Sequence, residues 1–217
     1  MKQFECVYFI GHHGLASWVL RFARNHGIFG GTICFGTGTA KSFWLNLFEL
    51  SQSEKEVLIM VAERGYAFRL MKLLDEELTL KKYNHGITFS LPAHSFTGGT
   101  HKEDLPLEGE EADNMYDAIT IVVNKGNAEE ALEAAQSAGA VGGTIINARG
   151  AGRNETSRFF MMDIEPEKEI LMMLVEKEKT EAISQAVHEK MKLEDHGNGV
   201  MFVQPVSKAY GLYQGEK

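Results

Sequence analysis

The chain has 217 residues, of which 44% are hydrophobic and 24% are charged, and its formal net charge is −8. This composition is ordinary for a globular protein, and the negative charge does not favour nonspecific binding to nucleic acid. No apolar run approaches the roughly 20 residues that a helix needs to cross a bilayer, and the N-terminus lacks a signal-peptide pattern. We therefore expect a cytoplasmic protein without membrane insertion and without a nucleic-acid partner.

The first half of the chain alternates short apolar runs with helical patterns. β-branched runs predict strands, and apolar residues at helical spacing predict helices. The expected order is strand, helix, strand, strand, helix, strand, at residues 6–10, 15–25, 32–35, 57–62, 66–78 and 87–91. Cys6 and Cys34 lie in apolar runs, which favours core thiols over a disulfide scaffold.

The second half repeats this order more clearly. The expected strands and helices lie at residues 118–123, 128–138, 144–148, 169–175, 179–191 and 200–206. Asn127 is expected to be the N-cap of the first of these helices. Residues 158–164 are expected to extend from the sheet as a hairpin arm. The acidic residues at 163, 165, 167 and 169 alternate with apolar or basic ones, which indicates a solvated hairpin.

The two halves are also repeats at the level of single residues. Three of the matches are 30–33 with 142–145, 54–56 with 167–169, and 86–89 with 199–202. The register slips by only one residue over most of a domain length. We therefore predict an α+β protein with two ferredoxin-like (β-α-β-β-α-β) antiparallel α/β sandwich domains in tandem. The first copy spans residues 1–98, the linker 99–114 and the second copy 115–217.

An exposed sheet face follows from this fold class. The two helices of a ferredoxin-like domain cover one face of its sheet, and the other face needs a cover of its own. That cover is usually another subunit. We expect a homo-oligomer or a pseudo-trimeric assembly.

The run Arg149-Gly150-Ala151-Gly152-Arg153 is the best candidate for binding an anion. Its two glycines let the backbone turn and approach a ligand closely. The two arginines supply forked donors that suit phosphate oxygens, and successive N–H groups in such a loop can form an anion-binding nest. A second close-approach loop, Gly197-Asn198-Gly199, precedes the last strand.

These motifs carry a resemblance to a known family. The glycines and Thr144 of the repeat, the run 149–153, Pro166 and the strand after it resemble the PII nitrogen-regulatory signalling superfamily. The loop 197–199 and the strand that follows resemble the B-loop of that family, which clasps the nucleotide. The resemblance covers residues 117–212 and extends more weakly to the first copy.

The resemblance implies a signalling protein rather than an enzyme. Family members bind ATP or ADP in clefts between subunits and report it through an exposed loop to transporters, enzymes or regulators. By this analogy ATP, ADP or AMP is the expected effector. The effector residues are Gly142, Thr144, Arg149, Gly150, Gly152, Arg153, Gly197 and Gly199. A second wall from the first copy would comprise Gly30, Thr32, Gly38, Lys41 and Gly86.

This chain also departs from the family pattern. Val200 and Asn198 stand where the family has a lysine and an acidic residue, and Lys208 is the cation nearest to the missing C-terminal arginines. Two alternatives follow. One is a structural or partner-binding module without an effector, and the other is a metal-responsive protein on a similar trimeric architecture. Because the histidines match no ligand spacing, we predict no metal.

Overall fold

The structure is a computed structural model that describes residues 3–39, 53–82, 85–97, 111–150, 157–159, 162–164, 166–195 and 197–212. The chain forms two compact units. Unit 1 comprises Met1–Phe35, Glu54–Tyr116 and Pro205–Lys217, and unit 2 comprises Gly36–Ser53 and Asp117–Gln204. Each unit therefore takes its main part from one copy of the repeat and a short segment from the other.

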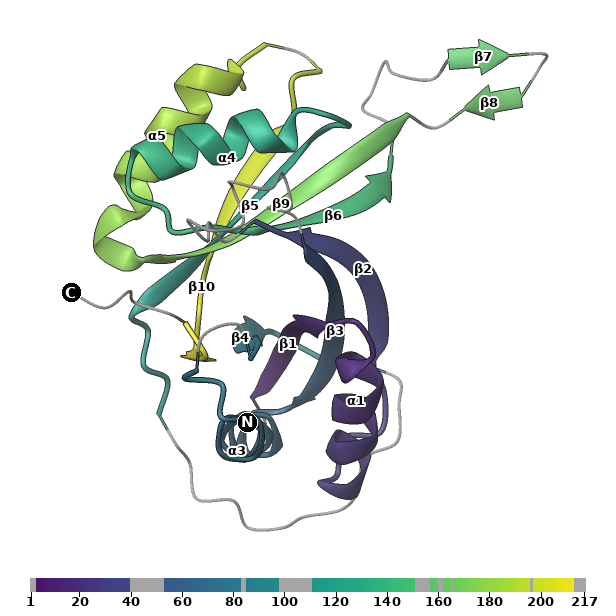
Figure 1. The fold of residues 1–217 in the computed structure, drawn as a ribbon, viewed down its shortest axis with the longest axis vertical. Helices are drawn as coiled ribbons and strands as arrows, with labels where there is room; N and C mark the ends of the chain where they lie inside the picture. Colours follow the sequence, from purple (N-terminus) through teal and green to yellow (C-terminus); the bar gives the residue numbers. More distant parts are fainter. Residues whose placement is uncertain are drawn as a thin grey trace. The chain divides into compact units, whose positions relative to one another are not determined.

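Unit 1 is built on the first copy. Its elements are β1 (Phe4–His12), α1 (Leu15–Asn25), β2 (Thr32–Gly38), β3 (Ser53–Glu63), α3 (Arg64–Leu78), β4 (Ile87–Ala93) and β11 (Lys208–Tyr210) (Figure 1). Its strands follow the order β2-β3-β1-β4-β11, and β1 pairs antiparallel with both neighbours. Residues of α1 and α3 share one apolar core with residues of β1 and β3, so both helices cover the same sheet face.

Unit 2 is built on the second copy. Its elements are β5 (Tyr116–Asn124), α4 (Ala128–Ser137), β6 (Thr144–Arg149), β7 (Ser157–Phe159), β8 (Met162–Ile164), β9 (Glu167–Glu176), a 3-10 turn (Lys177–Lys179), α5 (Thr180–Met191) and β10 (Val200–Pro205). The strand order is β10-β5-β9-β6, and residues 36–38 of β2 pair antiparallel with β6. The helices α4 and α5 pack side by side over one face (Figure 1).

The predicted fold is confirmed in both copies. Each has the order strand, helix, strand, strand, helix, strand, with helices on one face of an antiparallel sheet. The predicted arm is also present, since β7 and β8 pair as a separate two-stranded hairpin. The helix Leu15–Asn25 has the predicted bounds, whereas most strands extend beyond the apolar runs that predicted them.

Equivalent contacts fix the helix ends in the two copies. A glutamate of the third strand accepts a hydrogen bond from an N–H of the first helical turn, at 3.0 Å for Glu56 and Ala16 and at 3.1 Å for Glu169 and Ala128. At the end of the second helix, His85 Nδ1 lies 2.9 Å from the Leu78 carbonyl and Asn198 Nδ2 lies 3.2 Å from the Met191 carbonyl. The repeat therefore preserves capping geometry as well as sequence.

Two expectations about local structure are met only in part. Asn127 is the N-cap residue of α4, as predicted, but its side chain makes no capping hydrogen bond, and the carboxylate of Glu169 accepts a hydrogen bond from the Ala128 N–H. Nor does the whole acidic run lie in a solvated hairpin, since residues 167 and 169 belong to β9 and Glu169 is half-buried. The carboxylate that accepts a hydrogen bond at the start of α4 therefore comes from β9, which lies far from α4 in the sequence.

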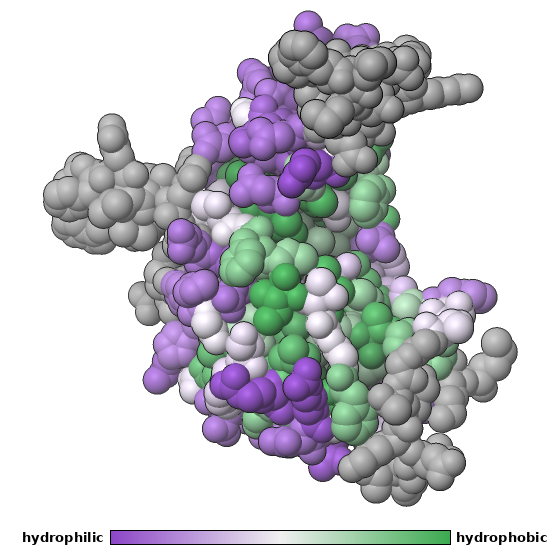
Figure 2. Space-filling view, turned by 90° about the vertical axis from the view of Figure 1, so that its right-hand side faces the viewer, coloured by the Kyte–Doolittle hydropathy of each residue, from purple (hydrophilic) through white to green (hydrophobic). Residues whose placement is uncertain are grey.

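Apolar side chains remain on the surface of both units. The most exposed are Phe35 and Phe29 in unit 1, and Met115, Val141, Val200, Phe202 and Val203 elsewhere in the chain. Figure 2 shows apolar residues gathered over part of one face and bordered by polar residues.

The free thiols of Cys6 and Cys34 are half-buried, and burial raises the pKa of the Cys6 thiol. Among the described helices, none has the length and apolar character needed to cross a membrane.

Candidate functional site

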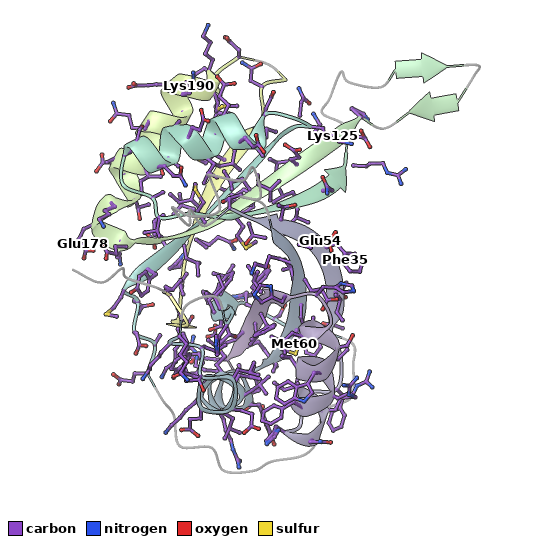
Figure 3. All side chains as sticks on the ribbon, viewed as in Figure 1. Phe35, Glu54, Met60, Lys125, Glu178 and Lys190 are labelled. Atoms are coloured by element: carbon purple, nitrogen blue, oxygen red, sulfur yellow. The ribbon has the colours of Figure 1, made fainter. Side chains whose placement is uncertain are left out.

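Cationic side chains gather at one end of the unit 2 sheet, where β6 ends and β9 begins. Arg149 is the last residue of β6, is exposed, and lies opposite Glu167 in the antiparallel register. Lys125, which follows β5, donates from Nζ to Glu167 Oε2 at 2.8 Å. Figure 3 shows Lys125 at this end of the sheet. We call this region the Arg149 end.

The charges at the Arg149 end favour an anion. The hydrogen bond and charge of Lys125, and then the charge of Arg149, hold the pKa of the Glu167 carboxyl below its usual value. The same contact raises the pKa of Lys125. Lys168 Nζ lies beside them, 2.6 Å from Asn124 Oδ1. Arg149 and Lys125 are both exposed, so an anion in solvent can approach these two cations, whereas Lys168 is buried.

Two predicted loops meet at the Arg149 end. Gly150 N–H donates to the Pro166 carbonyl at 3.1 Å, and no atom of the described residues lies within 4 Å of the place where a Cβ on Gly150 would stand. Gly197 is in the left-handed region, and its carbonyl accepts a hydrogen bond from Asn124 Nδ2 at 3.3 Å. The structure therefore brings Arg149, Gly150 and Gly197 to one end of the sheet. Gly152 and Arg153 lie outside the described residues.

The remaining predicted residues of the second copy lie at the opposite end of β6. Gly142 and Thr144 precede or begin the strand that Arg149 ends, so about 17 Å of extended chain separates Thr144 from Arg149. Thr144 is buried and pairs with Gly38 of β2. The predicted set is thus split into two groups that cannot both contact one small anion in the same unit.

Several of the motif glycines have a packing role. A Cβ on Gly199 would lie 2.5 Å from the Val122 carbonyl oxygen, and one on its counterpart Gly86 would lie 3.0 Å from that of Ile10. Both glycines also have left-handed backbones. A Cβ on Gly143 would lie 2.7 Å from Leu171, and the Thr39 side chain bonds the Gly143 backbone. The fold therefore needs these repeated glycines whether or not a ligand binds.

Most of the first-copy candidates belong to unit 1, whereas the Arg149 end belongs to unit 2. Gly30 and Thr32 are exposed and line a cavity of about 320 Å³ within unit 1. Gly86 precedes β4, and Lys41 lies outside the described residues. Lys208, the nearest cation to the missing arginines, lies over the Phe68 ring at 5.1 Å. The described positions therefore add no cation to the anion-binding candidates.

Sequence reasoning missed Lys125 and Lys168 as members of the site. Both positions carried a signal, because Lys125 follows a strand directly and Lys168 is the centre of the repeated Glu-Lys-Glu. Only the register of β9 against β5 and β6 shows that these lysines approach Arg149 from neighbouring strands. Among the described residues, no group of three or more His, Cys, Asp or Glu side chains is arranged to hold a metal ion.

Comparison with known proteins finds similarity to the second copy. Residues 116–216 match the family model described as "Nitrogen regulatory protein P-II". Similar solved structures include the complex of B. subtilis GlnK with ATP, at 19% identity over 43% of this chain and 84% of that chain, with a TM-score of 0.35. Another is Arabidopsis thaliana PII bound to citrate, at 22% identity over 44% and 78%, with a TM-score of 0.33. No curated protein sequence matches the chain.

Proposed function

We propose that this chain, whose residues 116–216 match the model of the nitrogen regulatory protein P-II family, is a signal-transduction regulator that binds an adenine nucleotide at the Arg149 end of unit 2. The observation that supports this proposal is the convergence of Arg149 and Lys125 on one carboxylate beside Gly150, in the part of the chain that matches the family. Exposed arginine and lysine side chains can donate charge-assisted hydrogen bonds to phosphate oxygens. GlnK of B. subtilis, a similar structure, is complexed with ATP.

The roles of individual residues follow from their chemistry. Arg149 and Arg153 donate to phosphate oxygens, Gly150 and Gly152 let backbone N–H groups approach them, and Lys125 adds a point charge. Gly197 lets the neighbouring loop approach from the other side of the site. Glu167 holds Lys125 until the ligand competes for it. The site binds and positions an anion and provides no nucleophile or acid–base pair for catalysis.

Gly142 contributes through oligomerisation in this proposal. It precedes β6, at the far end from Arg149, so it contacts the effector of another subunit rather than that of its own unit. In a homo-oligomer or pseudo-trimeric assembly, the base of a nucleotide held at one Arg149 end rests against Gly142 of a neighbour, while the buried Thr144 holds the start of β6 against Gly38. Binding then orders the loop after Arg149 and shifts its affinity for a partner protein such as a transporter, enzyme or regulator.

The test is titration calorimetry of the purified chain with ATP, ADP, AMP and bicarbonate. We expect at least one adenine nucleotide to bind, and Arg149→Ala to weaken that binding about tenfold, because it removes a charge-assisted hydrogen bond. Lys190→Ala is the matched control, since Lys190 is a cation of α5 that pairs with Glu130 at 3.0 Å, away from the Arg149 end (Figure 3). Its affinity should equal that of the unmodified chain.

The alternative is a structural or partner-binding module without an effector. The packing roles of Gly199 and Gly143 favour this alternative, because the fold would retain these glycines in a protein that binds no effector. If none of the four compounds produces heat, the effector proposal is wrong and this alternative holds. If binding occurs but is equally strong in Arg149→Ala, the effector lies elsewhere in the chain.

A further inference from the structure

The first helices of the two copies, labelled α1 and α4 in Figure 1, have surfaces of opposite charge. The two helices align in the repeat, because Ala16 and Ala128 donate to equivalent glutamates. The helix α1 carries Arg21 and Arg24, both exposed, and has no aspartate or glutamate. The helix α4 has no lysine or arginine and instead carries three exposed glutamates, which are Glu129, Glu130 and Glu133. Since both copies adopt the same fold, the fold does not require this difference.

Three rings stack along one side of α1. The ring centroids of Trp18 and Phe22 lie 5.1 Å apart, and those of Phe22 and His26 lie 4.3 Å apart. His26 Nδ1 lies 2.8 Å from the Phe22 carbonyl oxygen, which restrains the imidazole ring. Trp18 and Phe22 are only half-buried, so part of each ring is open to a partner. The register of the repeat places Glu130 and Ala134 at these two positions in α4.

The charges on these two helix surfaces are available to a partner. Within the part of the chain that the structure describes, neither arginine of α1 forms an ion pair, and neither does Glu133 of α4. Glu130, by contrast, pairs with Lys190 of α5 at 3.0 Å. Because the whole chain has a net charge of −8, two copies repel each other unless complementary local surfaces meet. A basic helix and an acidic helix supply such surfaces.

The spacing of the charges also matches. Residues three or four positions apart lie on one side of a helix. Arg21 and Arg24 have this spacing in α1, as Glu133 has with residues 129–130 in α4. When α1 of one chain lies antiparallel to α4 of another, Arg21 faces Glu133 and Arg24 faces residues 129–130. Trp18 then lies one turn beyond the first of these charge pairs.

We propose that α1 of one chain docks on α4 of a second copy of this chain. The half-buried rings of Trp18 and Phe22 provide the apolar contact area, and the charges of Arg21 and Arg24 select the acidic helix as partner. The contact does not use the open sheet faces, because each helix lies on the other face of its sheet. Each chain presents both surfaces, so every copy offers one basic and one acidic helix for association.

The test is sedimentation velocity of the full chain at increasing concentration, in low and in high salt. Self-association should weaken in high salt, because exposed charge pairs are screened. Arg21→Glu and Glu133→Arg should each weaken it about tenfold, since each places like charges opposite one another. The double variant R21E/E133R exchanges the two charges and should associate as strongly as the unmodified chain. Both residues are exposed, so these variants retain the fold.

Two controls match the changes in charge. Lys82→Glu alters the net charge of the chain as Arg21→Glu does, and Glu178→Arg alters it as Glu133→Arg does, at exposed residues outside α1 and α4. Neither control should change self-association. The proposal is overturned if association of the unmodified chain does not depend on salt, if Arg21→Glu associates as strongly as the unmodified chain, or if the double variant associates as weakly as the single variants.

A further variant tests the aromatic contact. Trp18→Glu introduces the residue that α4 carries at the same position, and it places a negative charge beside the acidic helix of the second copy. Self-association should fall about tenfold or more. Circular dichroism of this variant should retain the helical signal of the unmodified chain. Unchanged association of a folded Trp18→Glu variant would show that this side of α1 is not the contact surface.

Discussion

At the scale of single residues, the repeated glycines separate into two kinds. Gly86 and Gly199 combine a left-handed backbone with close approach to a carbonyl of the neighbouring strand, so no other residue fits without strain. Gly150 has open space around it and no left-handed backbone. A glycine that the fold does not need is the better candidate for a functional role, and Gly150 lies beside Arg149.

The substitution Gly199→Ala should therefore destabilise the protein by at least about 2 kcal/mol, because the new Cβ meets the Val122 carbonyl and the left-handed backbone is strained. Gly150→Ala is the control and should change stability by less than about 0.5 kcal/mol. Urea unfolding followed by circular dichroism measures both. Equal midpoints for the two variants would show that Gly199 is not constrained in this way.

At the scale of elements, each first helix depends on a residue from a distant strand. Glu56 and Glu169 lie on β3 and β9, and each carboxylate accepts a hydrogen bond from an N–H in the first turn of a helix. A negative charge at a helix N-terminus also interacts favourably with the helix dipole. The same β9 carries Glu167 and Lys168 into the Arg149 end. One strand thus holds both the helix and the candidate site in place.

We expect Glu169→Gln to lower stability by about 1 kcal/mol, since it removes the negative charge that caps α4. The matched control is Glu178→Gln, a charge removed from an exposed residue of the 3-10 turn (Figure 3). Thermal unfolding of the two variants measures the difference. A melting temperature that falls equally in both would mean that net charge, rather than the cap, is responsible.

At the scale of the whole molecule, the chain exchanges segments between its two units. Residues 36–38 of the first copy pair with β6 in unit 2, and β11 near the C-terminus pairs with β4 in unit 1. The Ser207 N–H donates to the Ser90 carbonyl at 2.9 Å, and Tyr210 packs against the core of unit 1. The folding of unit 1 therefore depends on residues from both copies.

A chain that ends at Val206 should consequently show faster hydrogen exchange in β4, although β4 belongs to the other copy. Loss of β11 makes β4 an edge strand and removes the apolar contact of Tyr210. A chain that ends at Leu212 keeps β11 and serves as the control. Exchange measured by mass spectrometry should be unchanged in that control. If β4 exchanges equally in both chains, β11 does not stabilise unit 1.

The sequence by itself determined the repeat, the order of the elements, the hairpin arm and the importance of the loop that begins at Arg149. These are local properties, because hydrophobic periodicity, glycines and charge are read along the chain. Resemblance to PII proteins added the expected effector class. Boundaries were less exact, since strands continue through polar residues when neighbouring strands supply their hydrogen bonds.

Only the tertiary structure decided which residues meet. It placed Lys125 and Lys168 at the end of the sheet where Arg149 lies, and it separated Gly142 and Thr144 from them. It also showed that the hydrogen bond at the start of α4 comes from Glu169 and not from the side chain of the N-cap residue Asn127. It also added β11, a strand of three residues that the sequence pattern did not predict. The physical reason is that strand register and pairing depend on contacts between segments that are distant in the sequence. A sequence pattern indicates which face of the sheet a residue occupies, but it does not indicate the residue's partner on the next strand.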